Sequence, residues 1–212
     1  MDVRGAMALY AVTDRSWLRG RTLPACVADA LAGGATCVQL REKHASFEEA
    51  CTMAHAILPL CRAAGVPLII NDNVEVARAV GADGVHVGQS DMACAAARAA
   101  LGPRAIVGVS VQTLPQARAA CAVAADYLGV GAVFPTSTKP DALAVSPSEL
   151  AAICAQVSIP VVAIGGVSAH TIGQLRGTGI AGAAVVSALF AADDIEAAAR
   201  ELAARIRAII EP

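Results

Sequence analysis

The sequence predicts an α/β protein that folds as a single (β/α)8 barrel, a TIM barrel with eight parallel strands, spanning residues 1–212. Short β-type apolar runs alternate with longer alanine- and leucine-rich stretches about once every 25 residues, as expected of repeated βα units around a parallel sheet. The runs number eight, which is the number that closes this barrel. Polar residues follow almost every run, whereas a doubly wound open sheet, the competing fold, normally has one ligand crevice.

The expected strands are short apolar runs without helical periodicity, which is typical of parallel strands that are buried on both faces. In chain order they are Ala8–Val12, Cys37–Leu40, Leu68–Ile70, Gly84–Val87, Ile106–Val109, Tyr127–Val130, Val161–Ile164 and Ala183–Val186.

The stretches between these runs carry helix start and stop signals. Ser46, Thr113 and Ser146 each precede a segment with acidic residues or proline in its first turn, which is the preference of a helix N-terminus. Glycines follow several of the segments, as the turns from helix to strand require. The expected helices include Leu23–Leu31, Phe47–Ala63, Met92–Leu101, Leu114–Ala124, Pro147–Gln156 and Ile195–Ile209.

Composition argues against nucleic-acid and membrane partners. The formal net charge is −2 and aromatic residues make up 3% of the chain, so neither a basic field nor stacking platforms for bases are expected. The hydrophobic fraction is 56%, yet no span of about 18 apolar residues runs unbroken. The run Ala6–Val12 leads directly into Thr13 and Asp14 without a small-residue cleavage site, which disfavours a signal peptide. We expect a cytoplasmic protein that acts on small-molecule substrates.

Seven cysteines are an odd number and form no CxxC pair. They predict neither a disulfide framework nor a zinc site, and we interpret them as small buried hydrophobic residues.

Lysine is rare in this chain. Among sixteen Lys and Arg residues only Lys43 and Lys139 are lysines, and each follows shortly after an apolar run. Because the ammonium group is a compact charge suited to phosphate oxygens, these two lysines mark the expected reaction centre.

The carboxyl ends of barrel strands meet at one rim, so polar residues that are distant in sequence gather there. Arg41 and Lys43 alternate with Glu42, and an extended backbone places both cations on one face, where they can hold a diphosphate. The alternative, surface ion pairs with Glu42, Glu48 or Glu49, is equally compatible with this segment.

Oxygen ligands follow two neighbouring strands. Asn71 and Asp72 end one run, and Asp91 comes shortly after the next. Mg²⁺ binds few carboxylates and keeps sites for water and substrate phosphate, so Asp72 and Asp91 are candidate magnesium ligands. Helix capping, by Asp72 before Asn73 and by Asp91 before Met92, explains either residue alone.

Two further segments are candidate anion sites. The hydroxyl-rich run Thr136 to Lys139 can wrap an anion, although an ordinary proline-flanked turn explains it equally. Gly165-Gly166 and Val186-Ser187 follow the seventh and eighth runs, where barrels bind a phosphate through backbone amides and a short helix N-terminus. A Cβ at position 166 is expected to enter the space of the phosphate.

Nucleophilic catalysis is not predicted. Ser110 has no identifiable base partner in the sequence, and His44, His55 and His170 fall in loops or helices. His86 lies within a strand, where it either faces the rim or is a hydrogen-bonded core residue.

The ordered motifs together resemble the thiamine phosphate synthase family over nearly the whole chain. They are Gln39-Leu40-Arg41-Glu42-Lys43, Asn71-Asp72, Gly84-Val85-His86-Val87-Gly88-Gln89-Ser90-Asp91, Gly108-Val109-Ser110, Thr136-Ser137-Thr138-Lys139, Ile164-Gly165-Gly166-Val167 and Val185-Val186-Ser187. The resemblance implies a TIM-barrel transferase that couples hydroxymethylpyrimidine diphosphate to a thiazole phosphate or carboxythiazole phosphate, giving thiamine phosphate and diphosphate with Mg²⁺.

The resemblance also implies roles for single residues. Asp72 and Asp91 would bind the metal; Arg41, Lys43 and Lys139 would hold the diphosphate; Gln39, Asn71 and Ser110 would orient the pyrimidine ester; Thr136 and Thr138 would contact the thiazole; Gly166, Val186 and Ser187 would bind its phosphate; and Leu40, Glu42 and Ser137 would complete the substrate site. Lys139, Ser110, Arg41 and Lys43 are the expected catalytic residues.

Two alternatives remain beside the transferase: a thiazole tautomerase on the same barrel, and a barrel that binds thiazole phosphate without catalysis. The tautomerase family uses a histidine where this chain has Gln112, which weighs against the first.

Overall fold

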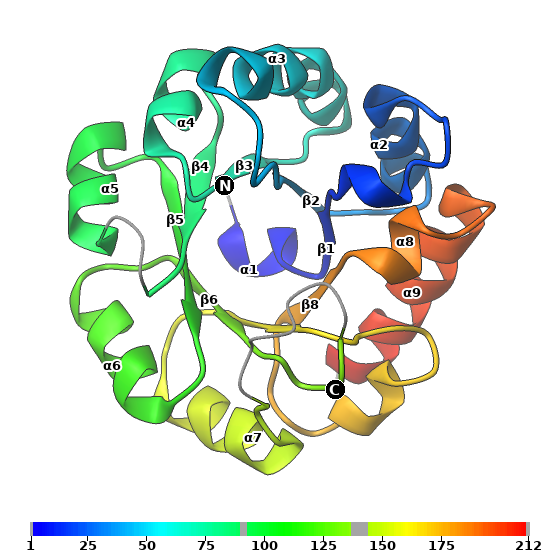
Figure 1. The fold of residues 1–212 in the computed structure, drawn as a ribbon. Coiled ribbons are helices and arrows are strands. Elements are labelled where there is room, and N and C mark those ends of the chain that lie inside the picture. The colour runs from blue at the N-terminus through cyan, green and yellow to red at the C-terminus, as the bar shows by residue number, and fades with distance from the viewer. Residues whose placement is uncertain (1, 90–92, 137–143, 211–212) are drawn as a thin grey trace.

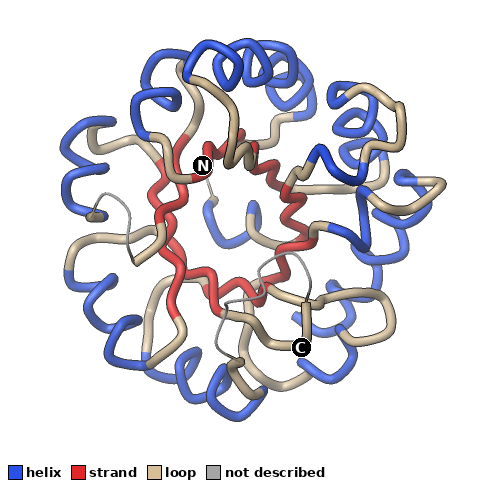
Figure 2. The backbone as a smooth tube through the Cα atoms, viewed as in Figure 1, coloured by secondary structure: helices blue, strands red, loops and turns tan. Residues whose placement is uncertain are grey.

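Eight parallel strands close into one barrel in the chain order β1 to β8 (Figures 1 and 2). The computed structural model describes residues 2–89, 93–136 and 144–210. The strands are β1 (Leu9–Val12), β2 (Cys37–Leu40), β3 (Leu68–Asn71), β4 (Gly84–Val87), β5 (Ile106–Val111), β6 (Tyr127–Val130), β7 (Val161–Ile164) and β8 (Gly182–Val185). Closure between β1 and β8 confirms the predicted barrel and excludes the open sheet.

A ring of helices surrounds the strands in Figure 1. The longer helices are α2 (Leu23–Ala32), α3 (Phe47–Ala64), α4 (Val74–Val80), α5 (Cys94–Leu101), α6 (Leu114–Ala122), α7 (Pro147–Gln156) and α9 (Ile195–Ile210). Shorter elements are α1 (Val3–Ala6), η1 (Arg15–Trp17), η2 (Ile172–Leu175) and α8 (Ser187–Phe190). None of the helices in the described ranges has the length and hydropathy of a membrane span.

The predicted helix starts at Ser46, Thr113 and Ser146 are confirmed. Each side chain accepts a hydrogen bond from the backbone N–H three residues on, and the Glu or Gln side chain at that position accepts one from the backbone N–H of the cap residue. These reciprocal capping boxes satisfy amides that a helix cannot satisfy internally, so the helix starts are fixed locally by the sequence.

Element boundaries differ from the prediction in several places. β5 continues to Val111, so Ser110 lies inside a strand rather than after it. α5 begins at Cys94 instead of Met92, and β8 is shifted by one residue, so Val186 becomes the N-cap position of α8. α4 was not predicted, because seven residues are too few for helical periodicity to show.

Two layers of buried side chains form the core. The outer layer lies between strands and helices and includes Leu40 and Val109, while the inner layer fills the barrel and includes Tyr10 and Tyr127. Val3 and Ala6 of α1 pack against the inner layer, and α1 lies behind the ring of strands in Figure 1. The amino-terminal end of the barrel is therefore covered, and the opposite end is the one that carries polar residues.

The cysteines are free thiols, and four of the seven are buried: Cys26, Cys37, Cys61 and Cys94. Burial raises the pKa of the Cys61 thiol to about 12 and that of Cys154 to about 11. These two thiols are protonated at neutral pH. The interpretation as buried hydrophobic residues is confirmed for the four buried cysteines, whereas Cys51, Cys121 and Cys154 are only partly buried.

Candidate active site at the carboxyl ends of the strands

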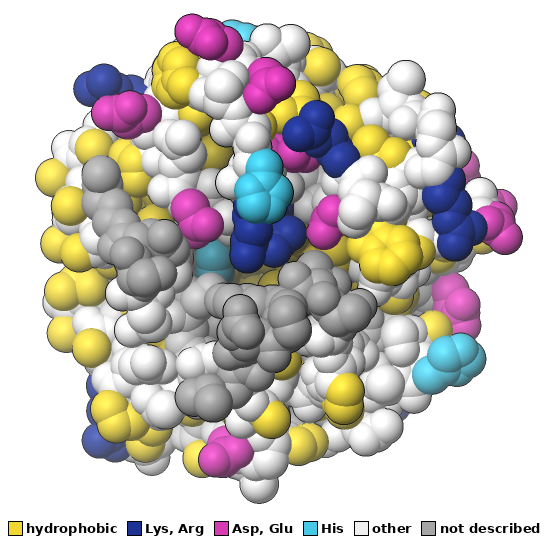
Figure 3. Space-filling view, viewed as in Figure 1, with side chains coloured by type: hydrophobic (Ala, Val, Ile, Leu, Met, Phe, Trp, Pro, Cys, Tyr) yellow, Lys and Arg dark blue, Asp and Glu magenta, His cyan; other side chains and the backbone are white. Residues whose placement is uncertain are grey.

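Polar residues that follow different strands lie at one rim of the barrel. Because the strands are parallel and neighbours in chain order, the segments after each of them open at the same end. Figure 3 shows charged and histidine side chains gathered around a central hollow at this end. The rim residues within the described ranges are Thr13, Arg41, Lys43, Asn71, Asp72, Gln89, Ser110, Thr136, Gly165, Gly166 and Ser187.

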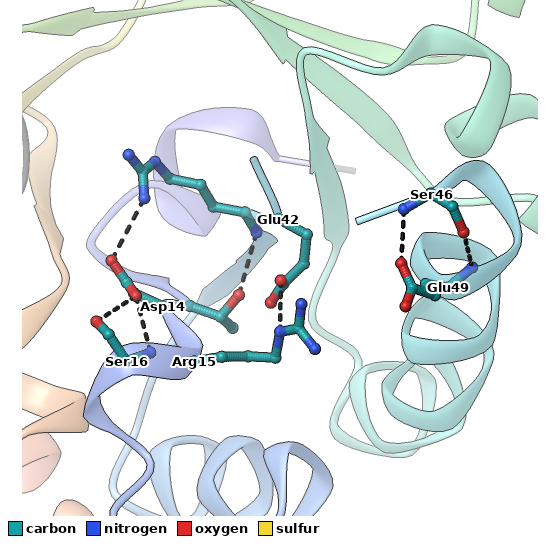
Figure 4. A network of polar contacts seen from close by, with 8 residues as sticks. Asp14, Arg15, Ser16, Glu42, Ser46 and Glu49 are labelled. Carbon is teal, nitrogen blue, oxygen red and sulfur yellow. Dashed lines mark hydrogen bonds and ion pairs between the residues drawn. The ribbon is translucent and has the colours of Figure 1, made fainter. Parts of the chain in front are cut away.

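The segments after β1 and β2 are joined by a network of charged side chains (Figure 4). Asp14 Oδ2 accepts from Arg41 Nη1 at 3.4 Å, and its Oδ1 accepts from the Ser16 backbone N–H at 3.0 Å. Thr13 Oγ1 accepts from the Arg41 backbone N–H at 3.1 Å. Arg41 is thus anchored at both its backbone and its guanidinium, with an exposed side-chain fraction of 16%.

Glu42 does not pair with either flanking cation. Its Oε2 accepts from Arg15 Nε at 2.6 Å, and Figure 4 shows Arg15 and Glu42 pointing toward one another. Glu49 is occupied by the cap of α3, where its Oε2 accepts from the Ser46 backbone N–H. Lys43 is exposed and forms no ion pair with any residue that the structure describes. The predicted alternative, in which Glu42 or Glu49 neutralises Arg41 and Lys43, is therefore wrong for those two acids.

The Glu42 carboxylate is nearly buried, with 8% of its side chain exposed. Burial raises the pKa of this carboxyl above its ordinary value, against the lowering effect of the Arg15 guanidinium. Among the described residues, none provides a hydrogen bond to its Oε1 atom. The neighbouring Leu40 side chain packs in the outer core layer.

At the end of β3, Asn71 and Asp72 form a fixed pair. Asn71 Nδ2 donates to Asp72 Oδ2 at 2.6 Å, and the Asp72 N–H donates to the His86 carbonyl at 2.8 Å. Asp72 has a φ of 61°, a left-handed conformation that Asp adopts more readily than most residues.

Capping of the following helix does not explain Asp72. The N-cap of α4 is Asn73, whose Oδ1 accepts from the Val76 N–H at 2.9 Å, so the expectation that Asp72 caps this segment is wrong. The carboxylate of Asp72 is a rim group rather than a helix cap. Asp91, the second predicted magnesium ligand, lies outside the described residues, and the N-cap position of α5 is Ala93.

A chain of hydrogen bonds crosses the barrel interior below the rim. Gln39 Nε2 donates to Tyr10 Oη at 2.9 Å, and the Tyr10 and Tyr127 hydroxyls lie 2.8 Å apart. His86 Nδ1 lies 2.9 Å from Tyr127 Oη, and its Nε2 lies 2.8 Å from Ser110 Oγ.

The sequence identifies no base partner for Ser110, and the structure brings His86 of the adjacent strand β4, 24 residues away, within hydrogen-bond distance of it. The other ring nitrogen of His86 faces a tyrosine hydroxyl instead of a carboxylate, which differs from the Ser/His/Asp arrangement. His86 is 8% exposed and hydrogen-bonded through both ring nitrogens, as a buried core histidine requires.

The turns after β7 and β8 differ in construction. Gly165 and Gly166 have φ values of 92° and 64°. A Cβ on Gly166 would lie 2.5 Å from the Pro135 carbonyl oxygen, so it would clash with the loop after β6. After β8, α8 begins at Ser187, and the Ser187 and Ala188 amides have no backbone partner within the described part of the chain. Both turns lie at the rim, as predicted.

Several predicted site residues cannot be placed. Ser137, Thr138 and Lys139 lie outside the described residues, like Asp91, whereas Thr136 is described and is partly buried in the loop after β6.

Comparison with known proteins identifies the family. The family model described as thiamine monophosphate synthase matches residues 9–189. A thiamine-phosphate synthase of Chloroflexus aurantiacus is 51% identical over 199 residues, covering 93% of this chain and 92% of that protein. The chain belongs to the thiamine monophosphate synthase family.

Other relatives support the same family assignment. The thiamine-phosphate synthase of Ruminiclostridium cellulolyticum is 50% identical over 194 residues, covering 92% of each chain. The solved structure of thiamine phosphate pyrophosphorylase from Pyrococcus furiosus has a TM-score of 0.91 at 37% identity, covering 98% of this chain and 99% of that one. Membership in the family makes this chain an enzyme, a transferase of thiamine biosynthesis that makes thiamine phosphate, as the sequence motifs predicted.

Sequence reasoning missed the hydrogen bonds that Tyr10 and Tyr127 form inside the barrel of this thiamine monophosphate synthase family member. A signal was present, because these are the only two tyrosines of the chain and both fall in predicted strands. A tyrosine hydroxyl that is buried in a barrel needs a hydrogen-bond partner, so two of them in inward positions predict a polar layer inside an otherwise apolar barrel.

Proposed function

We propose that the enzyme joins hydroxymethylpyrimidine diphosphate to a thiazole phosphate and releases diphosphate. The thiazole phosphate is accepted with or without a carboxyl group, and the carboxyl group, where present, leaves as CO2. The observation that carries this proposal is that two separate groups of candidate anion ligands lie on one rim. Arg41 and Lys43 follow β2, while Gly166 and the first amides of α8 follow β7 and β8. Two phosphorylated substrates that meet over the barrel require this arrangement.

The diphosphate is assigned to the side with full charges. Arg41 is held by Asp14 and by its own backbone contact to Thr13, which limits its motion, and Lys43 extends from the same segment with no competing ion pair in the described part of the chain. A guanidinium and an ammonium offer several donors to clustered oxygens, whereas backbone amides suit a monophosphate. Lys139 is proposed as the third cation and Thr136 and Thr138 as thiazole contacts, with Ser137 beside them.

The pyrimidine ester is assigned to the inner part of the mouth. Gln39 and Ser110 are the polar ends of the hydrogen-bond chain inside the barrel, and Asn71 lies beside His86 in register between β3 and β4. These side chains can orient a heteroaromatic ring through hydrogen bonds, with the reacting methylene group directed at the thiazole.

Mg²⁺ fits the end of β3. Asp72 supplies a carboxylate whose orientation is set by Asn71, and hard oxygen donors of this kind are what the ion prefers. Asp72 and Asp91 would hold it together with water and substrate oxygens. When bound, Mg²⁺ supplies positive charge that stabilises a departing diphosphate.

The proposed path is dissociative. Diphosphate leaves first, the pyrimidine-methyl cation that remains is captured by the thiazole nitrogen, and no general base is needed for either event. Arg41, Lys43 and Lys139 stabilise negative charge as it develops on the leaving group, and the two anion regions hold the partners close enough for capture before water intervenes. We also propose that the enzyme acts in the cytoplasm as a single-domain protein, without nucleic-acid or membrane partners.

An assay of purified protein with Mg²⁺ tests the proposal. Diphosphate release should require both the pyrimidine ester and the thiazole phosphate, and thiamine phosphate should form in equal amount. Conversion of the thiazole alone would instead indicate the tautomerase, and binding without turnover would indicate a non-catalytic barrel.

A further inference from the structure

The hydrogen-bond chain inside the barrel links side chains that sequence alone does not connect. It runs from Gln39 on β2 through Tyr10 on β1, Tyr127 on β6 and His86 on β4 to Ser110 on β5, with successive distances of 2.9, 2.8, 2.9 and 2.8 Å. Tyr10 and Tyr127 are about fully buried, at 1% and 0% exposure, and lie among apolar residues of the inner layer. Buried polar groups in such surroundings destabilise the fold unless each of them has a hydrogen-bond partner.

The strands leave space for this chain. A Cβ on Gly108 of β5 would lie 2.1 Å from Tyr127 Cζ, and a Cβ on Gly129 of β6 would lie 3.0 Å from His86 Cε1. Any larger residue at position 108 would displace the Tyr127 ring and break its contacts with Tyr10 and His86. Glycine at these two inward positions therefore leaves space for the two rings.

The hydrogen bonds of this chain all run in one donor-to-acceptor direction. The Gln39 amide nitrogen can only donate, so Tyr10 Oη accepts from it and has its own proton to give to Tyr127. Tyr127 then donates to His86 Nδ1, which leaves the ring proton on Nε2 to be donated to Ser110 Oγ. Burial raises the pKa of both phenols well above the ordinary value, so each keeps the proton that this order requires. At the end of this series of hydrogen bonds, the Ser110 hydroxyl oxygen accepts from His86. The Ser110 hydroxyl proton is then available to another acceptor.

We infer that Tyr127 and His86 are positioning residues that hold the Ser110 hydroxyl as a hydrogen-bond donor toward the substrate, and so select a ring that presents an acceptor nitrogen at that point. The inference rests on the proposed function, in which Ser110 faces the pyrimidine ester. A pyrimidine nitrogen with a free lone pair satisfies this donor, whereas a ring that carries N–H at the same position would set two donors against each other. Specificity for the heterocycle thus depends on groups that never touch it.

The first test measures the His86 tautomer in the free protein by ¹⁵N NMR, and is independent of substrates and of turnover. The four histidines of the chain are distinguished with a His86→Gln variant. The expected result is a neutral ring protonated on Nε2. Protonation on Nδ1 would reverse the direction of the chain and overturn the inference.

Matched tyrosine variants test the direction further. Tyr127→Phe removes the donor to Nδ1 and should increase the Nδ1–H form. Tyr10→Phe removes a hydroxyl of equal burial one step farther away, and Tyr127 can still donate to His86, so the tautomer should not change. Equal responses in the two variants, or none in either, would contradict a directed chain.

The second test is a double-mutant cycle on kcat/KM for the pyrimidine ester. Tyr127→Phe is expected to lower kcat/KM about tenfold, the size of one hydrogen bond. In a Ser110→Ala background the same change should cost less than about twofold, because it acts through the serine. Additive losses would assign Tyr127 a purely structural role. If thiamine phosphate does not form at all while His86 carries its proton on Nε2, the proposed function fails and the directed chain stands.

Discussion

Arg15 Nε donates to Glu42 Oε2 at 2.6 Å, and this pair joins η1 to the segment that carries Arg41 and Lys43. The carboxylate is 8% exposed whereas the arginine is 49% exposed, so the acid is the desolvated partner. Its position fixes the backbone between the two cations that we assign to the diphosphate. The pair is therefore expected to matter for stability more than an ordinary surface ion pair does.

Arg15→Ala should lower the free energy of unfolding by about 1–3 kcal/mol, because it leaves a nearly buried carboxylate without its donor. Arg205→Ala is the matched control, since Arg205 pairs with Glu201 at 2.8 Å with both side chains half exposed. That change should cost about 0.5 kcal/mol or less. Urea unfolding of both variants measures the difference, and equal losses would show that the burial of Glu42 is unimportant.

The pH dependence of stability should carry a contribution from Glu42. Its pKa is raised in the folded protein, so the folded state binds the proton more tightly than the unfolded state does. Stability that depends on this group therefore falls as pH rises from the unfolded pKa through the folded pKa, and the cost of the buried charge is complete above that window. Glu42→Gln removes the titrating group. Relative to this variant, wild type should gain stability as pH is lowered toward the ordinary pKa of Glu, and a wild-type curve that falls relative to the variant would contradict the sign.

Lys139→Ala should lower kcat on the order of 10²-fold, because its charge matters most as negative charge develops on the leaving diphosphate. The effect on KM should be smaller than that on kcat, since the interaction strengthens in the transition state. Lys139→Arg retains the charge but not the compact ammonium, so it should recover only part of the loss. Steady-state kinetics with the pyrimidine ester decides this, and turnover near wild type in Lys139→Ala would remove this residue from the mechanism.

Asp72→Asn should raise the Mg²⁺ concentration needed for half-maximal activity, with little change in thermal stability. The neighbouring Asn73→Ala variant provides the contrast, because Asn73 caps α4 and its loss should cost about 1 kcal/mol of stability. The metal requirement of that variant should stay the same. Titration of Mg²⁺ together with thermal melting separates the roles, and an unchanged Mg²⁺ requirement in Asp72→Asn would argue against metal binding there.

The fold could be predicted from the sequence because each strand and helix is specified locally. Capping boxes at Ser46, Thr113 and Ser146 fix where helices begin, and the apolar runs fix the strands to within one or two residues. The extension of β5 to Val111 was missed because the polar Ser110 resembles a strand end in sequence. Inside a barrel a polar residue can continue a strand when another strand supplies its partner, as His86 does here.

The site was predictable only in part for the same reason. Motif order placed the rim residues, because strand ends of a parallel barrel always meet. Which side chains pair across strands depends on register, so the contacts of Glu42 with Arg15 and of Ser110 with His86 could not be read from spacing. Whether Asp72 or Asn73 caps the helix likewise depends on a shift of one residue in where α4 begins, and the spacing does not reveal that shift.

Gly166→Ala should damage both stability and the thiazole phosphate site. Its φ of 64° is a left-handed conformation, and a Cβ would lie 2.5 Å from the Pro135 carbonyl oxygen and 2.7 Å from Phe134 Cβ. Backbone strain of this kind costs about 1–3 kcal/mol, and relief by movement would displace the turn after β7 that we assign to the phosphate.

Gly173→Ala in η2 is the control, because nothing lies within 4 Å of its added Cβ and its φ is not positive. Gly166→Ala should raise KM for the thiazole phosphate more than KM for the pyrimidine ester, whereas Gly173→Ala should leave both near wild type. Equal rises of the two KM values in Gly166→Ala would indicate a general loss of structure and would count against a phosphate site at this turn.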